Sequence, residues 1–270
     1  MIKETEIKPF RDAIEGFKSA CGCTVAELEL SDAYAIDKAA KARPDAIFVV
    51  GTRALRKASA IKNIPLVYTL VMPSEEAEHE ADNVSGVSMD VSPDVYLGAM
   101  TKLVPGVKRI GVLSDPEQTG PHVKEALVAA RARGLTLVVR TIARPKEATK
   151  ALEELRGKID AFWLLPDPTV VTPASVHYLM LFSFQNNLPV FSFSQRYTDL
   201  GAVASLGVDP FDLGVQAAGL AKRLVRGEKG PLREHARGGS LSVNRKVADK
   251  MGLNITGSDA ASTESKGGTK

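Results

Sequence analysis

The chain has 270 residues, 35 Lys and Arg against 32 Asp and Glu, a formal net charge of +3 and a hydrophobic content of 44%. This length allows two α/β domains of ordinary size, and the composition is typical of a folded, water-soluble protein. The basic residues are scattered and no apolar run approaches the roughly 18 residues of a membrane span, so neither a nucleic-acid partner nor a transmembrane segment is expected.

The first half of the chain alternates short β-branched runs with helical patterns, which is typical of a parallel α/β sheet. Strands are predicted at 2–5, 25–30, 45–50 and 66–70, and helices at 10–19, 34–41 and 54–61. The pattern then changes to an alternating edge strand at 84–89. Ser92-Pro93-Asp94 begins a helix that extends to about Val104, with Ser at the N-cap and Pro in the first turn.

The second half repeats the alternation. Strands are predicted at 109–113, 136–141, 161–165 and 190–194, and helices at 122–133, 146–156 and 174–186. A strand at 202–206, a helix at 212–225, a short strand near 240–243 and a last turn at 244–251 follow. The repeat predicts a second α/β lobe.

The predicted fold class is therefore α/β, with two Rossmann-like lobes that have parallel sheets and are joined by a hinge. Lobe one is expected to comprise 1–105 plus 198–227, and lobe two 106–197 plus 228–256. The segment from residue 198 is assigned to lobe one because its strand follows a completed four-strand series. Residues 257–270 lack the apolar content that offsets ordering entropy, so a disordered tail is expected.

The two cysteines, Cys21 and Cys23, flank Gly22 where the first helix should end. Residues two apart are poorly placed to bond to each other, and two sulfurs without nearby histidines make an incomplete zinc site. Two turn thiols are expected, and a redox or metal role is the alternative.

Polar loops follow several of the predicted strands, and open parallel sheets bind ligands at that edge. Their hydroxyl, carboxylate and amide groups are suited to holding a polar ligand. The predicted ligand-binding residues are Thr5, Gly51, Thr52 and Met72 in lobe one, and Asp115, Gln118, Thr119, Asp167, Thr169 and Ser194 in lobe two.

Asp115 and Asp167 each have a second interpretation, because both precede a proline and could serve only as helix caps. Thr52 after Gly51 could likewise be only an N-cap. A ligand contact predicts that Asp167→Ala weakens binding more than about tenfold and leaves the fold intact. A capping role predicts a lower melting temperature and unchanged affinity.

Catalytic signatures are missing from the sequence. The four histidines lie at predicted helix starts, on helix faces or in loops, and there is no GxSxG, HExxH, P-loop or GxGxxG run. A two-lobe racemase with one cysteine in each lobe is excluded because both cysteines lie within three residues. Trp163 and Phe162 fall in the middle of a strand and are expected in the core. No catalytic residue, cofactor or metal is expected.

Several segments together carry a family resemblance that spans most of the chain. They are Asp45–Ala54, Asn83–Ser88, Val107–Leu113, Trp163–Val171 and Leu213-Gly214. In these segments the chain resembles the ABC-transporter substrate-binding proteins of the tryptophan/tyrosine-binding-like group, of type I periplasmic-binding-protein fold.

The resemblance implies two lobes joined by three crossings that close on a small-molecule ligand, often an amino acid, and then dock on an ABC permease in the membrane. It places Thr52, Asp115, Thr119, Asp167 and Thr169 at the cleft, and implies a monomer in the periplasm or at the exterior of the cell envelope. The first residues, MIKETEIKPF, lack the pattern of a signal peptide, and the loop at Asp115 differs from many relatives, which have Asn or Ser there. The identity of the ligand stays open.

Two other classes remain as alternatives. A soluble ligand-sensing or regulatory domain could share this fold, although no DNA-binding or signalling segment is visible in the chain. A two-lobe isomerase or lyase is the third possibility.

Overall fold

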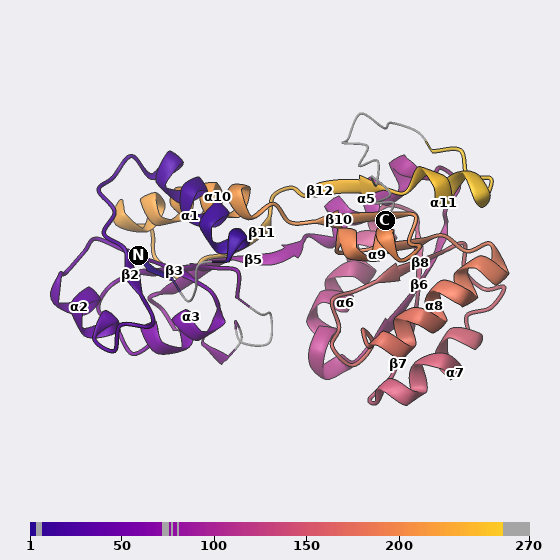
Figure 1. Ribbon diagram of the computed structural model, residues 1–270, viewed down its shortest axis with the longest axis horizontal. Helices are drawn as coiled ribbons and strands as arrows, with labels where there is room; N and C mark the ends of the chain where they lie inside the picture. Colours follow the sequence, from indigo (N-terminus) through magenta and orange to yellow (C-terminus); the bar gives the residue numbers. More distant parts are fainter. Residues whose placement is uncertain (4–6, 72–75, 77, 80, 256–270) are drawn as a thin grey trace, which may run out of the picture. The chain divides into compact units, whose positions relative to one another are not determined.

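The computed structural model describes residues 1–3, 7–71, 76, 78–79 and 81–255, and it divides into two compact α/β units (Figure 1). Unit 1 comprises Met1–Val91 and Val208–Gly239, and unit 2 comprises Ser92–Gly207 and the chain from Ser240 onward. The chain passes between the units at three points. The predicted two-lobed α/β fold class is confirmed.

Unit 1 is built on a six-stranded sheet in the order β11-β5-β4-β3-β1-β2, in which all the described pairings are parallel. Its strands are β1 (Ile2–Lys3), β2 (Leu28–Glu29), β3 (Ile47–Val50), β4 (Leu66–Thr69), β5 (Val84–Val91) and β11 (Arg233–Ala236). β3 and β4 are buried along their whole length, which explains their continuous apolar sequence.

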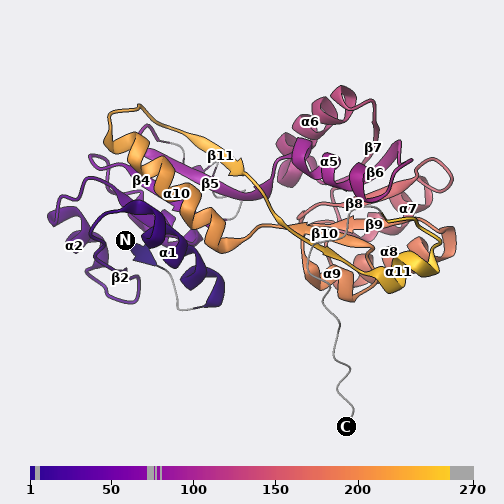
Figure 2. The ribbon, with the colours of Figure 1, turned by 90° about the horizontal axis from the view of Figure 1, so that it is seen from above.

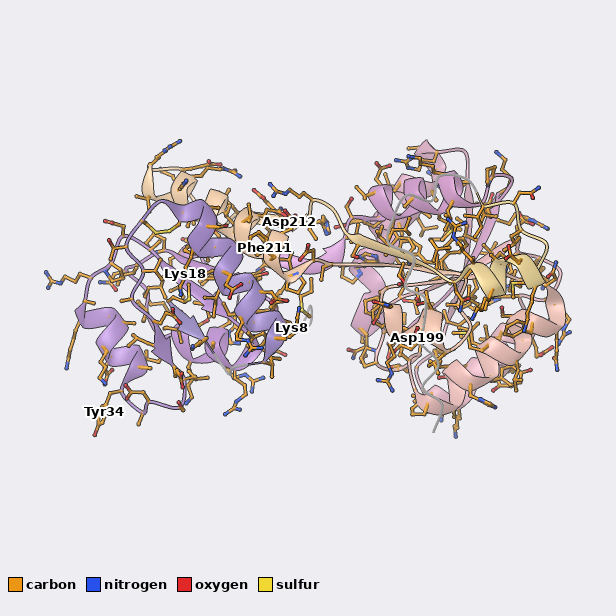
Figure 3. All side chains as sticks on the ribbon, turned by 45° about the horizontal axis from the view of Figure 1, so that its top comes forward. Lys8, Lys18, Tyr34, Asp199, Phe211 and Asp212 are labelled. Carbon is orange, nitrogen blue, oxygen red and sulfur yellow. A yellow bond between two sulfur atoms is a disulfide. The ribbon has the colours of Figure 1, made fainter. Side chains whose placement is uncertain are left out.

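Helices cover both faces of this sheet. In Figure 1, α1 (Lys8–Cys21) and α10 (Pro210–Val225) lie side by side on one face, and α2 (Ala35–Lys41) and α3 (Thr52–Ala58) lie on the other. Figure 3 shows Phe211 at the start of α10, next to α1. A Cβ atom on Gly16 would lie 1.9 Å from the carbonyl oxygen of Phe211, and one on Gly214 would lie 1.9 Å from that of Ala13. Glycine is therefore required at both positions for the two backbones to approach.

Unit 2 has a second six-stranded sheet, in the order β12-β10-β9-β8-β6-β7. Its strands are β6 (Arg109–Ser114), β7 (Thr136–Thr141), β8 (Ala161–Leu164), β9 (Val190–Ser192), β10 (Ala204–Gly207) and β12 (Ser240–Val243). β12 is antiparallel to β10, and the other described pairings are parallel.

The helices of unit 2 also form two layers. They are α5 (Pro93–Leu103), α6 (Pro116–Ala132), the 3₁₀ helix η1 (Pro145–Glu147), α7 (Ala148–Glu153), α8 (Pro173–Asn186), α9 (Gln195–Asp199) and α11 (Arg245–Lys250). Figures 1 and 2 show α5 and α6 on one face of the sheet and α7 and α8 on the other. Among the described helices of the whole chain, none is both long and apolar enough to cross a membrane.

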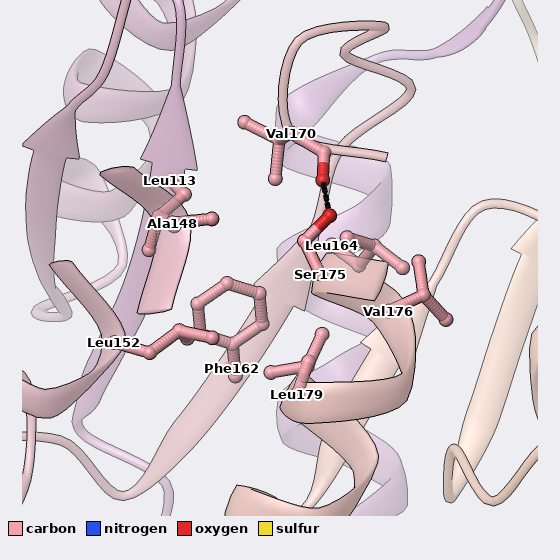
Figure 4. A pocket seen from close by; sticks show the side chains of 9 residues that line it. All are labelled: Leu113, Ala148, Leu152, Phe162, Leu164, Val170, Ser175, Val176 and Leu179. Atoms are coloured by element: carbon pink, nitrogen blue, oxygen red, sulfur yellow. Dashed lines mark hydrogen bonds between the residues drawn. The ribbon is translucent and has the colours of Figure 1, made fainter. Parts of the chain in front are cut away.

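The core of unit 2 is closely packed around Phe162 of β8 (Figure 4). The space between β8, α7 and α8 amounts to about 10 Å³, close to the minimum that holds a single water molecule. Its polar group is the hydroxyl of Ser175, which donates to the carbonyl oxygen of Val170. Trp163 and Phe162 are 2% and 1% exposed, so the prediction that both are core residues is confirmed.

The boundaries predicted for the two lobes were wrong at three places. The strand after residue 198 is β10, which pairs with β9 in unit 2, because it extends that sheet directly after the short helix α9. Residues 92–105 belong to unit 2, because α5 packs on α6 and Tyr96 donates to the carbonyl oxygen of Ser192. Residues 228–239 return to unit 1, because β11 pairs with β5. The tail predicted at 257–270 lies outside the described residues.

The expectation for the cysteines was also wrong. Cys21 and Cys23 are joined in a disulfide, with their Cα atoms 5.2 Å apart. The turn makes this possible, because Gly22 takes a left-handed conformation with φ of 61° at the end of α1.

Candidate ligand-binding site

The strand order of unit 2 brings together two loops that are far apart in the sequence. β6 lies between β7 and β8, and the helices that follow β6 and β8, α6 and α8, cover opposite faces of the sheet (Figure 2). In open α/β sheets, ligands commonly bind beyond the carboxyl ends of the strands at such a point of reversal. Asp115 follows β6, and Asp167 comes shortly after β8, so both lie at this edge.

Asp167 is completely buried, and its carboxylate accepts four hydrogen bonds. Oδ2 accepts from the backbone N–H of Asp115 at 2.7 Å and from the hydroxyl of Thr119 at 2.6 Å. Oδ1 accepts from the backbone N–H groups of Thr169 at 3.0 Å and Val170 at 3.1 Å. The carboxylate therefore joins the loop after β6 to the loop after β8.

Asp115 has two functions in the same network. Its Oδ1 caps α6 by accepting from the N–H of Glu117 at 3.0 Å, and its Oδ2 accepts from the hydroxyl of Thr169 at 2.7 Å. The hydroxyl of Thr119 also lies 2.8 Å from that of Ser114. Four predicted site residues, Asp115, Thr119, Asp167 and Thr169, thus belong to one hydrogen-bonded cluster.

Two further predicted residues of unit 2 lie beside this cluster. Gln118 is in the first turn of α6 and is partly exposed, as is Thr169. Ser194 is partly exposed and precedes α9 at the end of β9, the strand next to β8. Its backbone carbonyl accepts from Ser192, and we find no hydrogen bond between Ser194 and the cluster in the described part of the chain.

The predicted residues of unit 1 are only partly described. Gly51 follows β3 with φ of 100°, a conformation that favours glycine, and its N–H donates to the carbonyl oxygen of Thr69. Thr52 begins α3 and is partly exposed. Thr5 and Met72 lie outside the described residues.

Unit 1 contains a polar cluster that the sequence analysis missed. The ring of Tyr68 lies against Gly86 of β5, since a Cβ atom there would be 2.4 Å from the nearest ring atom. Two residues further along, the hydroxyl of Ser88 donates to Oε2 of Glu76 at 2.6 Å. Arg233 of β11 donates to the backbone carbonyl of Glu76 at 2.9 Å. The cluster therefore connects β4, β5 and β11 with the segment that contains Glu76.

Burial dominates the electrostatics of this second cluster. Glu76 is 6% exposed, and burial raises the pKa of its carboxyl group to about 7, against the opposing effect of the Ser88 hydroxyl. Nδ1 of His235 lies 3.4 Å from Oδ2 of Asp90 at the end of β5. Polar residues at alternate positions of β5, Ser88 and Asp90, were the signal in the sequence, but their partners come from distant segments.

Within the described ranges, no group of three or more His, Cys, Asp or Glu side chains is placed to hold a metal ion. The carboxylate of Asp167 has donors on both oxygens, and the elements around it provide hydroxyl and N–H groups. The described hydrogen bonds of these hydroxyl and N–H groups lie within the cluster, where they hold the two loops together.

Comparisons with known proteins identify the family and the fold of the chain. The model of the family described as ABC transporter substrate binding protein matches residues 16–265. A tyrosine-binding protein from Clostridioides difficile (strain R20291) is 26% identical over 239 residues, which cover 84% of this chain and 67% of that relative.

Two solved structures share the fold. The ligand-free, open structure of a substrate-binding protein with adhesive properties from Clostridium difficile has a TM-score of 0.73 and 22% identity, with coverage of 97% of this chain and 96% of the other. An ABC domain in complex with L-Trp from Streptococcus pneumonia has a TM-score of 0.57 and 18% identity, with coverage of 94% and 93%. Because the family model spans nearly the whole chain, this protein belongs to the family of ABC transporter substrate-binding proteins.

Proposed function

We propose that this chain is the solute-binding component of an ABC importer, that its ligand is an amino acid, and that an aromatic amino acid is the first candidate. The family match and the relative described as a tyrosine-binding protein support this proposal. The observation that carries it is the cluster of Asp115, Thr119, Asp167 and Thr169 at the carboxyl edge of the unit 2 sheet.

The members of the cluster have different tasks in this proposal. Thr169 and Gln118 are partly exposed and contact the ligand, together with the carboxylate of Asp115. Asp167 positions both loops, because its four hydrogen bonds leave it no free acceptor directed at a ligand. An amino-acid ligand would place its ammonium group on the carboxylate and hydroxyl oxygens, and its carboxylate on N–H groups.

Lobe one completes the site in this proposal. Gly51 and Thr52 follow β3, the strand of unit 1 that corresponds in sheet order to β8 of unit 2. Thr5, Met72 and Ser194 remain predicted contacts. Closure of the two lobes on the ligand would be the signal to a membrane permease, since a ligand that binds the closed state more tightly shifts the population toward it.

The direct test is calorimetric titration and thermal melting with L-tyrosine, L-tryptophan, other amino acids, nucleosides and sugars. A ligand at 100 times its dissociation constant should stabilise the chain by about 2.7 kcal/mol. Asp115→Ala should weaken binding more than about tenfold. Asp249→Ala, which removes an exposed carboxylate from α11, is the matched control and should leave the affinity unchanged. Failure of every solute to bind, or equal affinity of the Asp115 variant and the wild type, would contradict the proposal.

The proposal also includes the location and the partners of the protein. In this proposal the protein acts outside the cytoplasm as a monomer, and its membrane partner is an ABC permease. It does not bind nucleic acid, and it does not convert its ligand chemically. The disulfide between Cys21 and Cys23 supports this location, because disulfides persist mainly in oxidising compartments. Mass spectrometry after thiol alkylation of the protein purified from its source should show both cysteines blocked; two free thiols would remove this support.

A further inference from the structure

Unit 2 contains a cavity of about 390 Å³ between the amino-terminal part of α8 and the short helix α9. Three side chains from each helix line it: Val176, His177 and Met180 of α8, and Arg196, Tyr197 and Leu200 at α9. Pockets that bind small molecules commonly measure about 300–1,000 Å³. The volume is therefore that of a site for a small molecule.

One wall of the cavity is apolar and belongs to the core of unit 2. Its α8 residues are three or four positions apart, so they lie on one face of the helix. Val176 and Met180 are each 6% exposed and belong to the core cluster around Phe162. Leu200, which is 53% exposed at the end of α9, adds an apolar side chain at the opposite wall. These side chains can cover the apolar body of a ligand.

The turn after α9 holds the two walls in place. A Cβ atom on Gly201 would lie 3.2 Å from the ring of Phe184 and 3.8 Å from the sulfur of Met180, so the turn contacts α8 directly at these residues. No described residue of α8 beyond Met180 lines the cavity. The gap between the helices is thus closed at this end by packing.

The polar groups of the cavity come mainly from α9. Tyr197 is 9% exposed, and burial raises the pKa of its phenol, an effect that the positive charge of Arg196 opposes. The guanidinium is therefore close enough to act on the phenol. A buried tyrosine hydroxyl usually has a hydrogen-bond partner. In the part of the chain that the structure describes, we find none for the Tyr197 hydroxyl and no carboxylate paired with Arg196.

The charges around the cavity favour an anion. Arg196 is permanently positive, and the exposed His177 adds a second positive charge when it is protonated. Among the described residues that line the cavity, none is Asp or Glu. The ammonium group of an amino acid would therefore find no carboxylate there, whereas a carboxylate would find a guanidinium and a hydroxyl.

We propose that this cavity is a second binding site of the protein, for a small monocarboxylate that has an apolar body and no ammonium group. The carboxylate accepts hydrogen bonds from the guanidinium of Arg196 and the hydroxyl of Tyr197. The apolar body packs against Val176 and Met180.

This site is distinct from the one proposed for the solute. The lining of the cavity includes none of the four residues of the hydrogen-bonded cluster, Asp115, Thr119, Asp167 and Thr169. The two sites share one loop, since Val171 lines the cavity and its N–H donates to the carbonyl oxygen of Asp167 at 2.7 Å. Binding in the cavity does not depend on whether the solute is an amino acid.

The test uses octanoate as the probe and octanamide as its uncharged counterpart. Calorimetric titration should show that octanoate binds at least about tenfold more tightly, because hydrogen bonds to a charged group are about twice as strong as those between neutral groups. In a chain with ¹³C-labelled methionine methyl groups, octanoate should shift the NMR resonance of Met180, assigned with Met180→Leu. The resonance of Met100, a buried methionine of α5, should stay unchanged.

Variants then locate the carboxylate. Arg196→Gln should weaken octanoate binding about tenfold and Tyr197→Phe about threefold, whereas Arg196→Lys, which keeps the charge, should lose less than Arg196→Gln. Arg131→Gln, which removes an exposed arginine from α6, is the matched control and should keep wild-type affinity for octanoate, as should Asp115→Ala.

Three results would overturn the proposal. They are equal octanoate affinity of wild type and Arg196→Gln, equal affinity of wild type for octanoate and octanamide, and a Met180 resonance that octanoate does not shift. Loss of octanoate binding in Asp115→Ala would also overturn it, because the probe would then occupy the solute site. Failure of L-tyrosine to bind would contradict the proposed solute and leave these expectations unchanged.

Discussion

Unit 1 and unit 2 each bury a carboxyl group beside their sheet, but the surroundings of the two groups differ. Asp167 of unit 2 is 0% exposed and accepts hydrogen bonds from three backbone N–H groups and a hydroxyl. Glu76 of unit 1 is 6% exposed, with the Ser88 hydroxyl as a donor, and its pKa is raised to about 7. Burial alone does not decide what a carboxyl group does; the supply of donors around it does.

The difference originates in the elements that supply the donors. The loops after β6 and β8 direct backbone N–H groups into the space between them, as helix starts and tight turns do. Glu76 instead faces side chains on the surface of a sheet, whose own N–H groups are used in the strand ladder. A carboxylate with donors from two loops holds the loops together, whereas a buried carboxyl group with few donors has a raised pKa.

The largest expected effect comes from removing the carboxylate of Asp167, which accepts four hydrogen bonds. Asp167→Ala leaves four donors, three of them in buried hydrogen bonds, without their acceptor and should destabilise the chain by about 3 kcal/mol, which lowers the melting temperature by about 10 °C. This outcome is opposite to the one that the sequence predicts for a ligand contact, which is weaker binding with an intact fold. Thermal and urea unfolding measure it, with Asp249→Ala as the control that stays within about 0.5 kcal/mol of wild type. An unchanged melting temperature with lost ligand affinity would show that Asp167 is a ligand contact.

The second effect is a dependence of stability on pH that comes from Glu76. Its folded-state pKa is raised from 4.5 to about 7, so its contribution to stability is complete below pH 4.5 and is lost as the pH rises through 7. The loss amounts to at most about 3 kcal/mol. Glu76→Gln should therefore be more stable than wild type at pH 8 and should show a smaller change between pH 5 and pH 8.

The neighbouring residue Glu78 provides the control for this experiment. It is exposed, so Glu78→Gln should follow the wild-type pH profile. The difference between wild type and Glu76→Gln isolates Glu76 from the other titrating groups of the cluster, His235 and Asp90. Parallel pH profiles of wild type and Glu76→Gln, in urea unfolding, would contradict the assignment of a raised pKa to Glu76.

The smallest effects come from removing one hydroxyl donor in each unit. Thr119→Val should cost about 1 kcal/mol, because Asp167 keeps three donors. Ser88→Ala removes the donor that lowers the pKa of Glu76, so it should move the pH transition upward and destabilise the chain more at pH 8 than at pH 5. Urea unfolding at both pH values compares the two variants. If the free energy of unfolding depended on pH equally in Thr119→Val and Ser88→Ala, the proposed difference between Asp167 and Glu76 would be contradicted.

Much of the architecture could be predicted from local pattern. The continuous apolar run that ends at Val50 became β3, and the alternation of strands and helices predicted two α/β lobes. The position of Asp115 and Asp167 after buried strands predicted that they lie at the same sheet edge. Such features follow from the sequence because side-chain periodicity and turn residues act over a few positions.

Only the tertiary structure decided the lobe to which each crossing segment belongs and the partners of each buried polar group. β10 and β11 have four residues each, and the unit to which each belongs depends on the strand with which it pairs. The four donors of Asp167 come from two segments about 50 residues apart, and the Ser88 hydroxyl of β5 meets the carboxyl group of Glu76, 12 positions earlier in the chain. The sequence by itself determined which residues are polar and where strands end; packing between distant segments determined which of these residues meet and how much water they lose.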